Sequence, residues 1–222
     1  MILRPLLLES EKNEFQNGYS AIIVLGNYSM VGGDHMNLQD KLGKGLKPKA
    51  FIESMSVNQE KFHDVYESFT WKKEDEEYFA SLKENQQLQC FILAADWCGD
   101  VVRNVPIVFH AMEKAEIPTE VLVMEQNLDV MDQHLTMGGR SIPIVIFTDL
   151  EGNELKHWGP RPQRVQEPMV QFKRQHPTRD GVEDYEEKIK DVYREIGKRY
   201  GEGNLLYQEE IIHELRVLIS SI

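Results

Sequence analysis

The chain has 222 residues, with 25 basic and 37 acidic side chains and a formal net charge of −12. This excess of acid argues against nucleic acid or an anionic membrane as a partner. No apolar run approaches the roughly 20 residues that span a bilayer, and acidic residues directly follow the short apolar segment over residues 1–8, unlike in a signal peptide. We expect a cytoplasmic protein with reduced thiols, built as one domain with additions, whose oligomeric state the sequence leaves open.

Residues 1–35 show no helix or strand pattern that continues into the segment after them. Back-translation of Gly32-Gly33-Asp34-His35-Met36 permits the codons GGA-GGT-GAT-CAT-ATG, which spell a purine-rich bacterial ribosome-binding sequence and a start codon. We hypothesise that Met36 is the native start of a bacterial protein and that residues 1–35 are read-through of an upstream leader.

Residues 36–87 are predicted to form several short helices. Apolar and aromatic side chains recur there at helical spacing, as in Phe62, Val65, Tyr66 and Phe69. We interpret this segment as a helical preface that packs against the main domain.

Residues 88–177 alternate between strand and helix patterns. The first strand is apolar throughout, which is typical of burial on both faces. The order predicts an α/β domain with a mixed sheet and helices on both of its faces. The predicted elements are strand 90–95, helix 100–115 kinked at Pro106, strand 120–124, helix 128–135 with Asn127 as its N-cap, strand 142–148, strand 154–158 and helix 165–172.

Residues 178–222 are acidic and helical. Helices are predicted over 182–200 and 205–219, each with an apolar stripe at intervals of three and four residues, joined at Gly201-Glu202-Gly203. We expect this C-terminal extension to dock on the domain rather than on a partner.

The stretch Trp97-Cys98-Gly99-Asp100-Val101 carries the most information about function. It places a thiol at a strand-to-helix turn, where unpaired N–H groups and the helix dipole favour the thiolate. The Asp100 carboxylate acts in the opposite direction, and Arg103 one turn later could offset it. The sequence does not decide which effect prevails, and it leaves open that Asp100 merely starts a helix beside an incidental cysteine.

The second cysteine, Cys90, is expected to be a small core residue. It lies eight residue steps before Cys98, and at about 3.3 Å per extended residue the two sulfurs are too far apart for a disulfide.

The stretch around Cys98 resembles the thioredoxin superfamily, whose signature is a strand, the motif Trp-Cys-Gly-Pro-Cys and a helix that contains a proline. The resemblance covers roughly residues 88–175 and rests on the order and spacing of its parts together. The matching residues are Trp97, Cys98, Gly99, Pro106, the loop 139–143 as the family's cis-proline loop, and Gly159 after the fourth strand.

The resemblance implies that Pro143 is cis and faces Cys98, and that the backbone of Ile142 binds an extended substrate segment. Substrate contacts are then expected from Trp97, Gly99, Asp100 and Arg103. Two departures from the family pattern argue against dithiol chemistry. Val101 replaces the resolving cysteine, and Ile92 replaces the buried aspartate that serves it.

These features favour a monothiol protein in thiol–disulfide exchange or redox sensing, with Cys98 as its catalytic residue and protein thiols or low-molecular-weight thiols as partners. Exchange requires that Cys98 be ionised and accessible. The alternative is a thioredoxin-fold binding module without redox chemistry. A thiol-conjugating transferase resembling glutathione transferases ranks last, because the extension is too short for that family's helical domain. We expect no cofactor and no metal site, since the seven histidines are dispersed in the sequence.

Overall fold

The computed structural model describes residues 36–84, 87–203 and 205–222. The hypothesis on residues 1–35 therefore lies outside the described residues. Within the described ranges, none of the helices combines the length and the apolar character needed to cross a bilayer.

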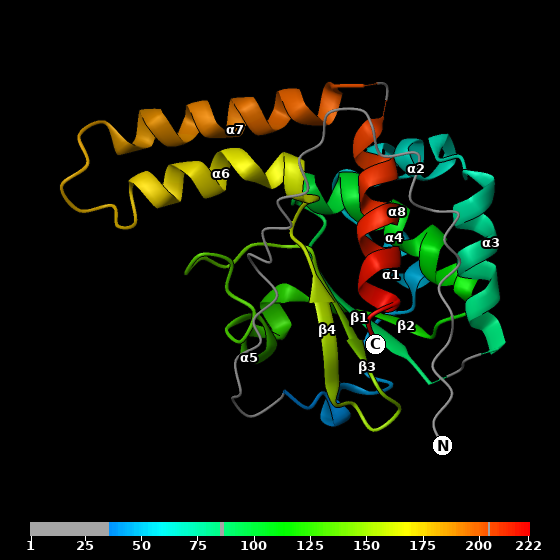
Figure 1. Ribbon diagram of the computed structural model, residues 1–222. Helices are drawn as coiled ribbons and strands as arrows, with labels where there is room; N and C mark the ends of the chain where they lie inside the picture. Colours follow the sequence, from blue (N-terminus) through cyan, green and yellow to red (C-terminus); the bar gives the residue numbers. More distant parts are fainter. Residues whose placement is uncertain (1–35, 85–86, 204) are drawn as a thin grey trace, which may run out of the picture. The chain divides into compact units, whose positions relative to one another are not determined.

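The fold is built on a mixed four-stranded sheet in the order β2-β1-β3-β4 (Figure 1). The central strand β1 (Gln89–Ala94) runs parallel to β2 (Thr119–Val123) and antiparallel to β3 (Ile144–Thr148), and β3 pairs antiparallel with β4 (Glu154–Trp158). All residues of β3 and all but the first of β1 are buried, as their apolar sequences predict. The predicted α/β class is confirmed.

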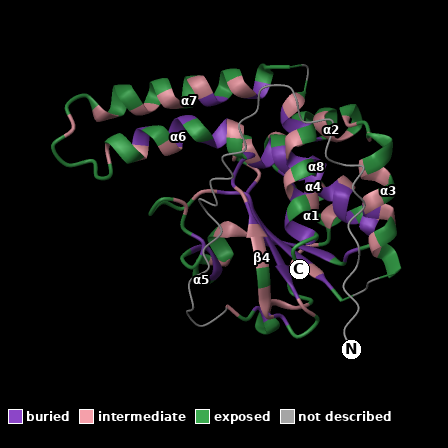
Figure 2. Ribbon diagram, viewed as in Figure 1, coloured by how far each residue is buried: buried purple, intermediate pink, exposed green. Residues whose placement is uncertain are grey.

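The crossover helix α4 (Gly99–Ala115) joins β1 to β2 and is buried along most of its length (Figure 2). It contacts α2 (Gln59–Ser68), α3 (Lys73–Ser81) and α8 (Leu206–Ile219). Burial on several sides explains why its sequence is apolar almost all round, and Pro106 lies inside it as predicted.

The N-terminal helices add an aromatic layer to this core. Phe51 of α1 (Pro48–Ser54) packs edge-on against Phe62 of α2 at 6.2 Å, and Phe62 lies 5.8 Å from Phe109 of α4. Fully desolvated aromatic pairs of this kind contribute more than their buried area alone. Single 3-10 turns are found at Gln39–Lys41, Leu82–Glu84 and Met124–Gln126.

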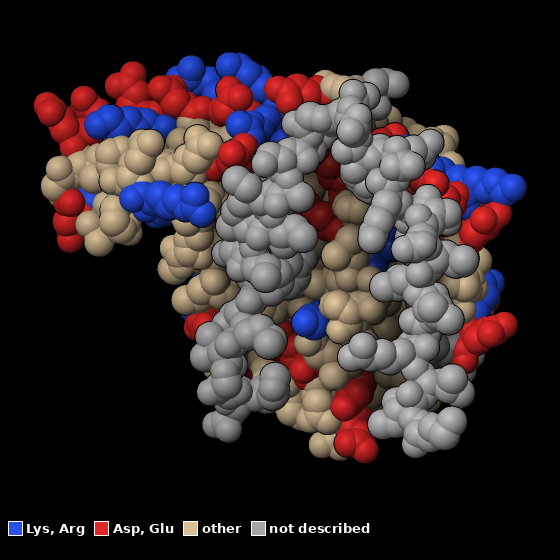
Figure 3. Space-filling view, in the orientation of Figure 1, with Lys and Arg blue, Asp and Glu red and all other residues tan. Residues whose placement is uncertain are grey.

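The C-terminal helices use their apolar stripes differently. Helix α8 packs against α3, α4 and β4, whereas α7 (Tyr185–Gly201) lies alongside α6 (Gln163–Gln175) (Figure 1). Only Ile196 and Tyr200 of α7 are buried. Acidic and basic side chains alternate over its outer surface (Figure 3). The domain limits at residues 87 and 177 stay predictions.

Two predicted bounds are corrected, and one predicted helix cap is refined. The helix after β2 is only one turn long, α5 (Leu128–Met131). Asn127 is the N-cap residue of this helix, as predicted, but its side chain makes no capping hydrogen bond. Its Nδ2 donates 2.9 Å to the carbonyl of Val123. Strand β3 begins at Ile144 rather than 142, since Pro143 has no N–H to give to the sheet.

Candidate functional site

Cys98 lies at the start of α4, immediately beyond the end of β1. Its backbone is extended, its carbonyl accepts the N–H of Val102 at 3.1 Å, and its own N–H donates to Ala95 at 3.2 Å. The side chain is half-buried, and its Sγ donates to the carbonyl oxygen of Ile142 at 3.4 Å. The thiol of Cys98 therefore touches the loop that precedes β3.

That loop contains a cis peptide bond between Ile142 and Pro143. Gly159 packs directly behind it with φ +127°, and a Cβ placed there would lie 2.2 Å from the carbonyl oxygen of Pro143. Only glycine fits such a close backbone approach in this conformation. The Gly159–Pro160 bond is also cis.

Asp100 is held away from solvent by a network that sequence reasoning did not predict. Its Oδ2 accepts from Arg161 at 2.6 Å, and its Oδ1 accepts from the Tyr200 hydroxyl at 2.9 Å. Asn104, fully buried, donates to both the carbonyl of Pro160 and the Tyr200 hydroxyl at 2.9 Å. The helix that carries Cys98 is thereby tied to α7.

The electrostatic balance at Cys98 favours the protonated thiol. Burial is the largest influence and raises the pKa of Cys98, and the charge of Asp100 raises it further. The N–H groups of Val101 and Asp100 and the charge of Arg161 lower the pKa by less. The thiolate that exchange requires is therefore only a minor species at neutral pH in the isolated protein.

Arg103 does not offset Asp100, contrary to the sequence-based suggestion. Its Nη1 donates 3.0 Å to the carbonyl of Gly99, and its guanidinium lies 5.0 Å from the centre of the Tyr200 ring. Arg161, just beyond β4, makes the ion pair instead. No sequence signal distinguishes these two arginines, because the pair with Arg161 depends on the return of the chain after β4.

Trp97 forms the exposed side of the turn. The residue is 56% exposed, and its Nε1 donates to Glu125 at 2.7 Å. On the other side, Asp96 accepts from the N–H groups of Ser56 and Val57 at 2.8 and 3.2 Å. The loop between α1 and α2 therefore fixes the start of the Cys98 turn.

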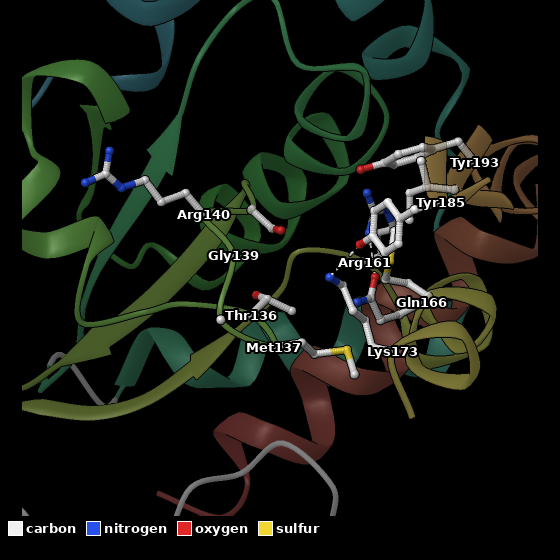
Figure 4. A pocket seen from close by; sticks show the side chains of 13 residues that line it. Thr136, Met137, Gly139, Arg140, Arg161, Gln166, Lys173, Tyr185 and Tyr193 are labelled. Carbon is white, nitrogen blue, oxygen red and sulfur yellow. Dashed lines mark hydrogen bonds between the residues drawn. The ribbon is translucent and has the colours of Figure 1, made fainter. Parts of the chain in front are cut away.

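A hollow of about 260 Å³ lies between the loop before Pro143 and the helices α6 and α7 (Figure 4). Arg161 links it to the Cys98 turn through Asp100. Lys173 and Tyr185, which share a 2.9 Å hydrogen bond, form its far side, whereas Arg140 points away and pairs with Asp132 at 2.6 Å. The lining residues are Thr136, Met137, Gly138, Gly139, Arg140, Ser141, Arg161, Gln166, Met169, Lys173, Tyr185, Ile189 and Tyr193.

A strand–helix–strand unit followed by a β-hairpin, with a cysteine at the first helix and a proline loop opposite it, defines a thioredoxin-like protein. A family model described as Thioredoxin matches residues 45–179. The chain belongs to this thioredoxin family. The matched segment is longer than the residues 88–175 that carry the resemblance in the sequence, and it includes most of the N-terminal helices.

Solved structures agree on the fold alone. A protein of unknown function from Pseudomonas aeruginosa aligns with a TM-score of 0.56 and 18% identity, over 80% of this chain and 93% of that one. An HIV epitope-scaffold aligns with a TM-score of 0.58 and 19% identity, over 83% of this chain and 96% of that one. No curated protein matches the sequence.

Proposed function

We propose that the protein carries out monothiol thiol–disulfide exchange through Cys98, with its substrate bound beside Pro143. The observation that carries this proposal is a single half-buried thiol at a helix start, with its Sγ 3.4 Å from the backbone of Ile142. Val101, fully buried, stands where a resolving cysteine would be. Trp97, Gly99, Asp100 and Arg103 frame the turn.

The exchange needs no external oxidant. The Cys98 thiolate attacks one sulfur of a substrate disulfide, a bond forms between them, and the substrate's S–S bond breaks. The second substrate sulfur leaves with the electron pair and takes up the proton that Cys98 has lost. A separate thiol, protein-borne or of low molecular weight, then attacks the mixed disulfide and restores Cys98. We place this reaction in the cytoplasm, where such thiols are available.

The raised pKa of Cys98 shapes both steps. Few molecules are ionised at neutral pH, so attack is slow. A thiol of high pKa is also a poor leaving group, so the mixed disulfide is long-lived once it forms. The protein is therefore suited to retain a captured thiol rather than to turn over rapidly.

Two features support a substrate site at this place. The main-chain groups of Ile142 lie outside β3, beside the thiol, where an extended segment can align. The neighbouring hollow is lined by Arg161 and Lys173 together with tyrosine rings. This lining suits a substrate that carries acidic or aromatic residues next to its disulfide.

The first experiment measures adduct formation by intact mass after incubation with oxidised glutathione. We expect one glutathione per chain on the wild type, retained after the excess disulfide is removed. Cys98→Ser should form none, whereas Cys90→Ser should behave as the wild type, because Cys90 is only 1% exposed. An adduct that survives in Cys98→Ser contradicts the proposal.

The second experiment restores a resolving thiol with Val101→Cys. Cysteine is smaller than valine and fits the same buried position with little strain. We expect the glutathione adduct to disappear, with an internal disulfide in its place. An adduct as persistent as in the wild type would mean that position 101 does not reach Cys98.

The alternative is a binding module in which Cys98 does no chemistry. The raised pKa of Cys98 and the exposed ring of Trp97 favour it. If the wild type forms no adduct even at pH 9, while the folded protein still binds extended peptides beside Pro143, this alternative replaces exchange.

A further inference from the structure

A cluster of two histidines and a glutamate lies at the β4 edge of the sheet. His134, in the turn after α5, places its Nε2 3.1 Å from Oε2 of Glu154. His157 places its Nδ1 2.7 Å from Oε1 of the same carboxylate. Three potential ligand atoms, one from each residue, lie within 4.8 Å of one another. The cluster plays no part in the proposed exchange.

A β-bulge brings Glu154 and His157 to one side of β4. In a regular strand, residues three apart point to opposite faces. Here Phe147 pairs with Lys156 and Thr148 with Glu154, so that Leu155 is an extra residue. A bulge is a common means of redirecting a side chain. Because of it, a carboxylate and an imidazole that sequence spacing would separate are adjacent.

The surroundings of His134 fix the role of its ring nitrogens. Its Nδ1 lies 2.8 Å from the carbonyl oxygen of Val130, which can only accept, so Nδ1 carries a hydrogen. Nε2 therefore points at the Glu154 carboxylate, and a cation, either a proton or a metal ion, has to lie between them. An imidazole whose second nitrogen donates to a backbone carbonyl is the usual arrangement of a metal-ligating histidine.

We propose that these three residues bind a divalent cation of the zinc type, with Nε2 of His134, a carboxylate oxygen of Glu154 and Nδ1 of His157 as ligands. Zinc accepts two imidazoles and one carboxylate at about 2.0–2.2 Å and leaves a fourth position for solvent. The side chain of His134 is 2% exposed and that of His157 is 34% exposed, so the ion has a rigid inner ligand and an open route of entry. The bound ion would link β4 to the loop that leads to Pro143.

The test uses the untagged full chain, stripped of metal, in a Zn²⁺ titration against a chromophoric chelator. We expect one equivalent of Zn²⁺ per chain, and a loss of affinity of at least about tenfold in both His157→Ala and Glu154→Gln. His63→Ala, an exposed histidine on α2, should bind as the wild type. Cys98→Ser should also bind normally, since the cluster contains no thiol.

A second measurement guards against misfolded variants. Zn²⁺ should raise the thermal midpoint of the wild type and of His63→Ala, but not that of Glu154→Gln, because only a ligand that binds the folded state stabilises it. The proposal is overturned if the wild type binds no Zn²⁺ at micromolar concentration, which would leave a simple His134–Glu154 ion pair. Equal binding by the wild type, His157→Ala and Glu154→Gln overturns it as well.

Discussion

Among the partly buried carboxylates that join the C-terminal helices to the rest of the fold, Asp100 and Glu214 are held in opposite ways. Asp100 meets Tyr200 of α7 together with a cation, the guanidinium of Arg161. Glu214 of α8 accepts from Nε1 of Trp158 and the N–H of Gln163, both at 2.7 Å and both neutral.

Burial raises the pKa of Glu214 to about 7, the two hydrogen bonds oppose this by less, and the nearby charge of Glu210 adds to it. A carboxylate buried against neutral donors is therefore poised to change its charge near neutrality. Asp100, by contrast, forms an ion pair with Arg161. The charges of these two residues also shift the pKa of Cys98. The same extension of the chain thus provides one fixed attachment and one that responds to pH.

The largest effect is expected from Arg161→Met, which removes the cation and leaves Asp100 without a charged partner. The side chains of Arg161 and Asp100 are 7% and 15% exposed. Breaking a buried pair on one side costs about 3 kcal/mol or more in free energy of unfolding. Urea denaturation measures this cost.

The matched control is Arg140→Met. Arg140 makes a bidentate pair with Asp132, but these side chains are 47% and 48% exposed, so the loss of stability should be much smaller than in Arg161→Met. Equal destabilisation in the two variants would show that burial does not distinguish the two pairs.

The contrast between these arginines also shows what the sequence could predict. Periodicity and turn residues are local signals, and they sufficed for the strands, most of the helices and the Cys98 turn. Arg140 and Arg161 look alike in the sequence, because the difference lies in contacts made by Asp100 and Tyr200 from distant segments. The cluster of His134, Glu154 and His157 could not be predicted for a related reason. Regular strand alternation places Glu154 and His157 on opposite faces of β4, whereas the bulge at Leu155 brings them to the same side.

An effect of at most similar size, and one that depends on pH, is expected at the other attachment, in Glu214→Gln. The folded-state pKa of about 7 exceeds the ordinary value of 4.5, so the folded protein holds this proton more tightly than the unfolded chain. Stability from Glu214 is complete below pH 4.5 and declines as the pH rises to 7 and above. The loss is about 3 kcal/mol at 1.36 kcal/mol per pKa unit.

Glutamine at position 214 does not titrate. The difference in unfolding free energy between variant and wild type should therefore shift in favour of the variant between pH 4.5 and pH 8. Glu209→Gln, on the same helix but 51% exposed, should show no comparable shift. A parallel pH dependence in Glu214→Gln and the wild type would mean that Glu214 ionises normally in the folded state.

The smallest effect is expected on the chemistry of Cys98 in Asp100→Asn. The charge of Asp100 raises the pKa of Cys98 and that of Arg161 lowers it, so the substitution removes the raising charge and keeps the lowering one. The pKa of Cys98 should therefore fall, and alkylation by iodoacetamide at pH 7.5 should become a few-fold faster. The pH dependence of that rate, followed by intact mass, measures the shift.

The urea-unfolded Cys90→Ser variant, in which Cys98 is the one remaining thiol, gives the reference rate for an ordinary thiol at this position. Folded wild type should react more slowly than this reference, because burial is the main cause of the raised pKa. Asp100→Asn should lie between the two, since the charge is removed but the burial remains. If the variant reacts as slowly as the folded wild type, access to Sγ rather than ionisation limits the reaction, and the ion pair between Asp100 and Arg161 serves to attach α7 rather than to adjust the thiol.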